Sequence, residues 1–146
     1  MRLIREIRFY PSDGAGEVTN SWAGTGESTY LGAYRVLRAV VEGPVDGRTG
    51  YLCDIKEIDR VLRAVVAPAL RGVADDVGSL TRALAAAFPA SAEQCPVPAA
   101  LWAIELHVSP HTRLAIDKGG SGMMRLTQSF EFSAAHRLFC AELSDA

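Results

Sequence analysis

The chain has 146 residues, of which 49% are hydrophobic and 22% charged, and its formal net charge at pH 7 is -2. This composition is typical of one globular domain and excludes a chain that is disordered throughout. The slightly acidic balance and the scattered arginines give no reason to expect nucleic acid as a partner. No segment approaches the roughly 20 apolar residues of a membrane-spanning helix, so no membrane partner is expected either.

The cysteine pattern points to a reducing compartment. The three cysteines are widely spaced: Cys53, Cys95 and Cys140. Without a CxxC pair they predict neither a disulfide framework nor a cysteine-based zinc site. Arginines also interrupt the apolar N-terminal segment, so no signal-peptide core forms there. We therefore expect a cytoplasmic protein.

Two strands are predicted in the first third of the chain. Residues 2 to 10 alternate imperfectly between apolar and charged side chains, which predicts a half-buried strand. The buried face of this strand would carry Leu3, Ile7 and Phe9. Pro11 to Glu27 is rich in Gly, Ser and Thr and predicts a long loop. Tyr34 to Glu42 is β-branched and apolar on both faces, which predicts a second, well-covered strand.

Two helices are predicted next. Asp54 can cap the first helix, with Glu57 three residues later as in a capping box. An apolar stripe at helical spacing follows: Ile55, Ile58, Val61, Leu62, Val65, Val66, Ala69 and Leu70. Pro68 should kink or end this helix, because its ring removes a backbone donor and clashes with the preceding turn. The second helix is predicted from Ser79 to Pro89, with a thin apolar stripe of Leu80, Leu84 and Phe88.

The last third of the chain predicts three more strands. Residues 101 to 108 alternate, with Glu105 and His107 facing outward. The core-facing residues of this strand would be Trp102, Ile104, Leu106 and Val108. A turn at Ser109–Pro110–His111 leads to a return strand from Thr112 to Asp117, and residues 118 to 122 form a flexible break. Residues 124 to 132 then predict an appended strand, which pairs with a sheet edge or stays mobile.

These elements predict an α+β domain with an antiparallel four-stranded sheet and two helices on one face. The appended strand also resembles the first strand. MRLIREIRF at residues 1 to 9 and MRLTQSFEF at residues 124 to 132 align without a gap and share Met, Arg, Leu and Phe. Because this similarity follows a Gly-rich break, it indicates the start of a second tandem copy.

The segment FEFSAAHRL, from Phe130 to Leu138, resembles the first signature of the 6-pyruvoyl and 6-carboxy tetrahydropterin synthase family, whose bacterial members serve queuosine biosynthesis. The resemblance makes His136 one of three zinc ligands. Two looser similarities lie in the first copy. GYLCDIKEI, from Gly50 to Ile58, resembles the entry into the family's first long helix, with Asp54 as its Asp, and Tyr34–Arg35–Val36 resembles a family strand.

The resemblance implies the tetrahydropterin-synthase-like (tunnelling) fold. Residues 1–117 would be a degenerate first domain, 118–123 a linker, and 124–146 the beginning of a second copy. A complete tandem protein would be a zinc-dependent lyase that acts on dihydroneopterin triphosphate. Its partners would be a pterin-type small molecule and other copies, either in a homo-oligomer or paired with a complete copy.

Several positions depart from the family pattern. The two zinc-binding histidines of one family strand fall on Tyr30 and Gly32, neither of which binds zinc usefully. No cysteine lies in residues 21–24, where the family's catalytic Cys would fall, and no Asp-His pair lies in residues 70–80. The pterin-anchoring Glu falls on Val108, with Ser109 in the place of the following Thr. We therefore predict no catalytic residue in this chain, and no stoichiometric zinc.

Other candidate residues have simpler explanations. His107 and His111 are expected to be solvated, Glu105 to be an exposed strand carboxylate, and Asp54 a helix cap. Cys53 precedes a helix, which can lower a thiol pKa, although a small buried core residue is the simpler reading. Cys140 does not match the family cysteine, and the loop from Asp13 to Glu27 lacks a phosphate-binding pattern.

Three functions therefore stay open: a lyase, a non-catalytic half that completes an oligomeric barrel, and a module that binds a small ligand.

Overall fold

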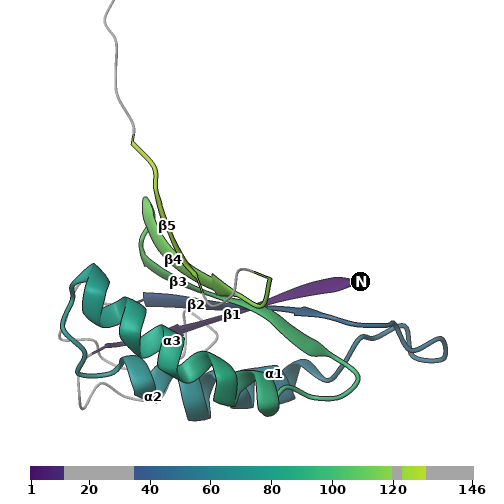
Figure 1. The fold of residues 1–146 in the computed structure, drawn as a ribbon. Coiled ribbons are helices and arrows are strands. Elements are labelled where there is room, and N and C mark those ends of the chain that lie inside the picture. The colour runs from purple at the N-terminus through teal and green to yellow at the C-terminus, as the bar shows by residue number, and fades with distance from the viewer. Residues whose placement is uncertain (12–34, 120–122, 131–146) are drawn as a thin grey trace, which may run out of the picture.

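A five-stranded antiparallel sheet with helices on one face forms the fold in the computed structural model, which describes residues 1–11, 35–119 and 123–130. The strands lie in chain order, from β1 at one edge to β5 at the other: β1 (Arg2–Phe9), β2 (Arg35–Glu42), β3 (Ala100–Ser109), β4 (Thr112–Asp117) and β5 (Met124–Gln128). Figure 1 shows the helices gathered below the sheet. The predicted α+β architecture is confirmed, except that the sheet has five strands because the appended segment pairs with β4.

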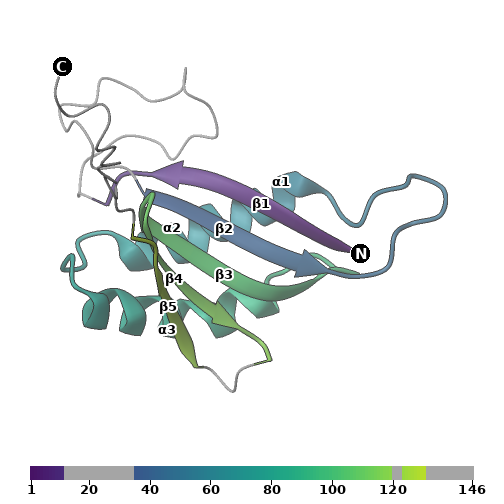
Figure 2. The same ribbon diagram turned by 90° about the horizontal axis from the view of Figure 1, so that it is seen from above.

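The helical layer lies between β2 and β3 in the chain. It contains α1 (Ile55–Val61), a π-helical segment η2 (Leu62–Val66), α2 (Ala67–Leu70) and α3 (Val77–Glu93). In Figure 2, α1 lies beneath β1 and β2, and α3 crosses beneath the other half of the sheet. Within the described residues, no helix combines the length and the apolar character needed to cross a membrane.

One row of apolar side chains shows where the core lies. Ile7, Leu37, Leu106 and Leu114 are register partners across four strands and are at most 1% exposed. Leu126 continues the row on β5 but is 49% exposed. The helices therefore cover the sheet as far as β4, while most of β5 extends beyond them.

The first helix starts as predicted and ends later than Pro68. The Asp54 carboxylate accepts a hydrogen bond from the Lys56 backbone N–H at 2.9 Å, which confirms the cap. The predicted capping box is wrong, because the Glu57 carboxylate binds Arg60 at 3.0 Å. The wide π-helical turn before Pro68 lets the chain continue to Leu70, and Gly72 follows at a φ of 66°.

The second helix is longer than predicted at both ends, spanning Val77–Glu93 rather than Ser79–Pro89. Asp76 caps it, since its carboxylate accepts from the Ser79 backbone N–H at 2.8 Å. The helix continues past Pro89, which lies on its exposed side. The buried Ser91 hydroxyl donates to the Ala87 carbonyl at 2.8 Å, which helps to hold this last turn.

Strand β3 contains a bulge that changes its facing pattern. Val40 pairs with Ala103 and Val41 with Leu101, which leaves Trp102 as the extra residue. Trp102 is therefore outside the buried core, contrary to the prediction, and Leu101 is buried in its place. The indole ring instead lies 4.5 Å from the Arg2 guanidinium.

One ion pair joins β1 to the helical layer. Arg5 donates two hydrogen bonds to the Asp59 carboxylate, at 2.6 and 2.7 Å. The two side chains are 26% and 14% exposed. Asp59 raises the pKa of Arg5, mainly through the hydrogen bonds. This bidentate contact fixes the first strand on its helix.

Candidate binding face of the sheet

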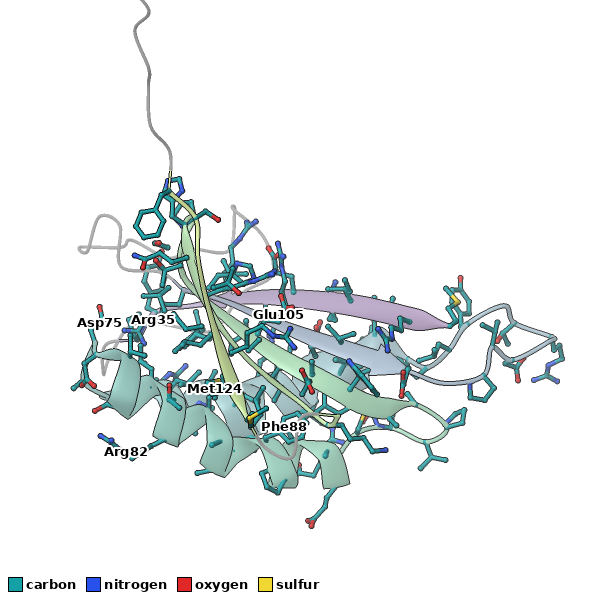
Figure 3. All side chains as sticks on the ribbon, turned by 45° about the horizontal axis from the view of Figure 1, so that its top comes forward. Arg35, Asp75, Arg82, Phe88, Glu105 and Met124 are labelled. Carbon is teal, nitrogen blue, oxygen red and sulfur yellow. The ribbon has the colours of Figure 1, made fainter. Side chains whose placement is uncertain are left out.

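The sheet face turned away from the helices carries most of its charged side chains. Register partners place Glu6, Arg38 and Glu105 side by side on β1, β2 and β3. Figure 3 shows Glu105 on the sheet, opposite the helix α3 that carries Arg82 and Phe88. Arg125 on β5 lies in the same row, with Ala115 of β4 between it and Glu105. We call this surface the open face.

One group on the open face is centred on Glu6. Its carboxylate accepts a hydrogen bond from the Arg38 Nε at 2.9 Å and lies 3.5 Å from an Arg8 guanidinium nitrogen. All three side chains are about one-third exposed, between 30% and 37%. Such contacts stabilise a fold by about 0–1 kcal/mol each, so this group mainly fixes the positions of its charges.

A second group is centred on Glu105. Its Oε2 lies 3.3 Å from the His107 Nε2 and 3.9 Å from an Arg113 guanidinium nitrogen. Glu105 and His107 are only 22% and 19% exposed, so they are less solvated than an outward-facing pair on a strand is expected to be. An oriented carboxylate with an imidazole beside it is suited to accept donors from a polar ligand or to exchange a proton with it.

Side chains of the types that bind zinc do not cluster in the part of the chain that the structure describes. No group of three His, Cys, Asp or Glu side chains gathers within residues 1–11, 35–119 and 123–130. Glu105 and His107 supply two donors, but the guanidinium of Arg113 beside them disfavours a cation. The predicted ligand His136 lies outside the described residues, as do Tyr30 and Gly32.

The structure describes three other predicted positions. Val108 packs against the core as an apolar side chain. The Ser109 hydroxyl accepts a hydrogen bond from the exposed His111 backbone N–H at 3.2 Å, so it supports the β3–β4 turn.

The Cys53 thiol is half-buried. Burial is the main cause that raises its pKa, and the nearby Asp54 charge raises it further. This shift is opposite to the lowered pKa that was considered for a thiol at a helix N-terminus. Cys140 and the loop from Asp13 lie outside the described residues.

Two features were not predicted from the sequence. Arg35 is 4% exposed at the start of β2, and its guanidinium donates to the Asp75 carboxylate at 2.6 Å (Figure 3). A hollow of about 590 Å³ lies between the β2–α1 loop and Pro98, with Tyr51 and Cys53 in its lining. The pattern of a strand can place Arg35 on one face of the sheet but cannot identify its partner. The hollow is formed by a loop and a proline that are far apart in the sequence, so no local sequence pattern predicts it.

Comparison with known proteins does not place the chain in a family. No family model matches it, and no curated protein matches it.

Proposed function

We propose that this chain is a non-catalytic sheet unit of the tetrahydropterin synthase kind, in which the beginning of a second copy continues the sheet of the first. The observation that carries this proposal is the position of β5. Residues 124–132, which begin with β5, share Met, Arg, Leu and Phe with residues 1–9, and β5 lies antiparallel beside β4 as the next strand of the same sheet. A tandem protein whose copies share one continuous sheet requires such a strand at this edge.

The side chains of the two related strands support this proposal. Leu126 aligns with Leu3 in the repeat, and Leu126 pairs with the buried Leu114 on the helix side of the sheet. Arg125 aligns with Arg2, and both belong to the open face. The repeated strand therefore has the same orientation in the sheet as the first.

Residues at the positions that carry the family's chemistry differ from the family pattern. Tyr30 and Gly32 offer no imidazole where the family has two, and Val108 cannot accept the charge-assisted hydrogen bonds of a pterin edge. By resemblance, the lyase chemistry of a complete tandem protein belongs to a second copy, with His136 as its first zinc ligand. Zinc there would polarise the oxygens of the substrate side chain.

The test is a measurement of zinc content and turnover on the purified chain. We expect far less than one zinc ion per chain, and no conversion of dihydroneopterin triphosphate. His136→Ala should leave the zinc content unchanged, because one imidazole does not make a site. Stoichiometric zinc that is lost in His136→Ala, or turnover by the chain alone, would contradict the proposal.

The Glu105 group favours a second candidate function, binding of a small polar ligand on the open face. Its carboxylate is partly sheltered and keeps oxygen lone pairs that could meet two neighbouring donors of a pterin-like ring edge. Titration with neopterin, followed by fluorescence, tests this function. Binding that Glu105→Gln abolishes and Glu6→Gln preserves would support it, and absence of binding would exclude neopterin as the ligand.

A further inference from the structure

The hollow of about 590 Å³ lies at the end of the sheet where β2 stops and β3 begins. Its walls are formed by the loop between β2 and α1 and by Pro98, which precedes β3. Figure 2 shows this loop extending beyond the end of β2 before the chain enters α1. Pockets that bind small molecules have volumes of about 300–1,000 Å³, so the hollow has the size of a ligand site.

Both walls of the hollow are fixed before any ligand arrives. In the loop, the Asp46 N–H donates to the Tyr51 carbonyl at 2.9 Å, and the Asp46 carbonyl accepts from the Gly50 N–H at 2.8 Å. Gly50 has a φ of 74°, which glycine adopts readily. On the other wall, a Cβ on Gly43 would lie 3.0 Å from the Pro98 carbonyl oxygen, so a glycine lets β2 approach this segment closely. A preformed site loses little entropy when it binds a ligand.

Apolar side chains at the hollow remain exposed. Tyr51 and Ile55 belong to its lining and are 73% and 45% exposed. Val45 and Val97 each adjoin a lining residue in the chain, and they are 41% and 92% exposed. Exposed apolar groups that gather at one place are typical of a surface that binds a ligand or a partner.

The charge of the hollow is negative. Asp46 and Asp54 contribute two carboxylates, and the described lining contains no Lys, Arg or His. The Asp46 Oδ1 accepts from the Thr49 and Arg48 N–H groups at 2.7 and 2.9 Å and from the Thr49 hydroxyl at 3.0 Å. These hydrogen bonds, with the Thr49 N–H first, lower the pKa of Asp46, so its charge is present at neutral pH.

Each carboxylate keeps an oxygen for an external donor. The described residues that bind Asp46 all reach Oδ1, and Asp54 uses its Oδ1 to accept the Lys56 N–H at 2.9 Å. The Asp54 charge also offsets the positive end of α1, which by itself disfavours a cation. Asp46 lies in the loop, so its charge is not offset in this way.

We propose that this hollow binds an organic ammonium ion with an apolar body, of the arylalkylamine class. The ammonium group donates to the Oδ2 atoms of Asp46 and Asp54, and the ring of Tyr51 adds a cation–π contact. The body of the ligand packs against Ile55 and Pro98. An anion of the same shape is excluded, because it would meet two carboxylates and no cation. This site goes beyond the proposed role as a sheet unit and does not rest on it.

The test is an NMR titration of the full-length chain with 2-phenylethylammonium near neutral pH, where an alkyl amine is protonated. Neutral 2-phenylethanol and anionic 3-phenylpropionate carry the same ring on a similar chain and are the matched controls. We expect a Kd on the order of 1 mM for the ammonium ion, and binding of both controls about tenfold weaker or less. Absence of saturable binding, or equal binding of either control, overturns the inference.

Substitutions that remove charge but keep hydrogen-bond acceptors locate the site. Asp46→Asn with Asp54→Asn should raise the Kd about tenfold or more, while the helix cap is kept because asparagine caps as well as aspartate. Asp76→Asn changes the corresponding cap of α3, away from the hollow, and should leave the Kd unchanged. Asp46→Asn alone replaces the double variant if circular dichroism shows that it does not fold. A folded variant that binds as tightly as the wild type overturns the inference.

Discussion

The two faces of the sheet are formed by alternate residues of the same strands, and they differ in burial and charge. On the helix side, Leu37 and Leu106 are fully buried and adjacent in register. On the open face, their chain neighbours Arg38 and Glu105 are also register partners but stay partly exposed. Burial of apolar side chains on the helix side stabilises the fold. The ion pairs on the open face hold charged side chains in position but contribute little to stability. The comparison indicates that stability and candidate binding chemistry reside on opposite faces.

The largest expected effect comes from substitutions at two adjacent residues of β3. Leu106→Ala should lower the free energy of unfolding by about 2–5 kcal/mol, because it opens a cavity in the covered face. Glu105→Ala, on the open face, should cost less than about 1 kcal/mol. Urea denaturation followed by circular dichroism measures both. Equal costs would mean that the open face is buried against something in solution.

An intermediate loss of stability is expected when the ion pair between Arg5 and Asp59 on the helix side is removed. Removal of either Arg5 or Asp59 should destabilise the chain, because their two short hydrogen bonds are partly sheltered. A double-mutant cycle with Arg5→Gln and Asp59→Asn should give a coupling energy of about 1–2 kcal/mol. The same cycle for Glu6 and Arg38 on the open face is the control and should give less than about 1 kcal/mol. A larger coupling for the control pair would reverse the comparison.

The smallest effect concerns thiols on the helix side. Burial is the main cause that raises the pKa of both Cys53 and Cys95, with lesser contributions from Asp54 and Cys53 respectively. Since the folded pKa lies above the unfolded one, the associated stability is present below about pH 8.5 and is lost as the pH rises through the folded values. Alkylation by iodoacetamide, resolved by peptide mass spectrometry, should therefore have a pH midpoint above about 8.5 at both residues.

The unfolded chain in guanidinium chloride provides the reference for these thiols. There, both should react with a midpoint near about 8.5. A folded-state midpoint at or below that of the unfolded chain would show that the thiols are not sheltered. Cys53→Ala and Cys95→Ala should each reduce the loss of stability at alkaline pH.

Local sequence patterns predicted much of the fold. Alternation located β1 and most of β3, β-branched composition located β2, and the Asp54 cap and the apolar stripe located the first helix. Predictions from local patterns were wrong where tertiary contacts determine the structure, or where the alternation of a strand is interrupted. A helix that continues past Pro89 depends on its surroundings, and a bulge at Trp102 breaks the period of two that the prediction assumes.

The candidate site was less predictable than the fold. Alternation placed Glu105 and His107 on the outward face, but it does not tell that they lie 3.3 Å apart or that Arg113 from the next strand joins them. That group depends on the β3–β4 register, which contains an irregularity between His107 and Ser109. The Arg35–Asp75 pair likewise joins residues 40 positions apart. Contacts between distant positions are not encoded in the spacing of one strand.

The extra residue at Trp102 also has a consequence for alignment. Before it, Leu101 points to the helices, and after it Ile104 and Leu106 do, so that the inward positions change from odd to even numbers within one strand. An alignment of this strand with a sheet that lacks the bulge therefore needs a one-residue gap at Trp102. Without that gap, inward and outward positions are exchanged on one side of Trp102.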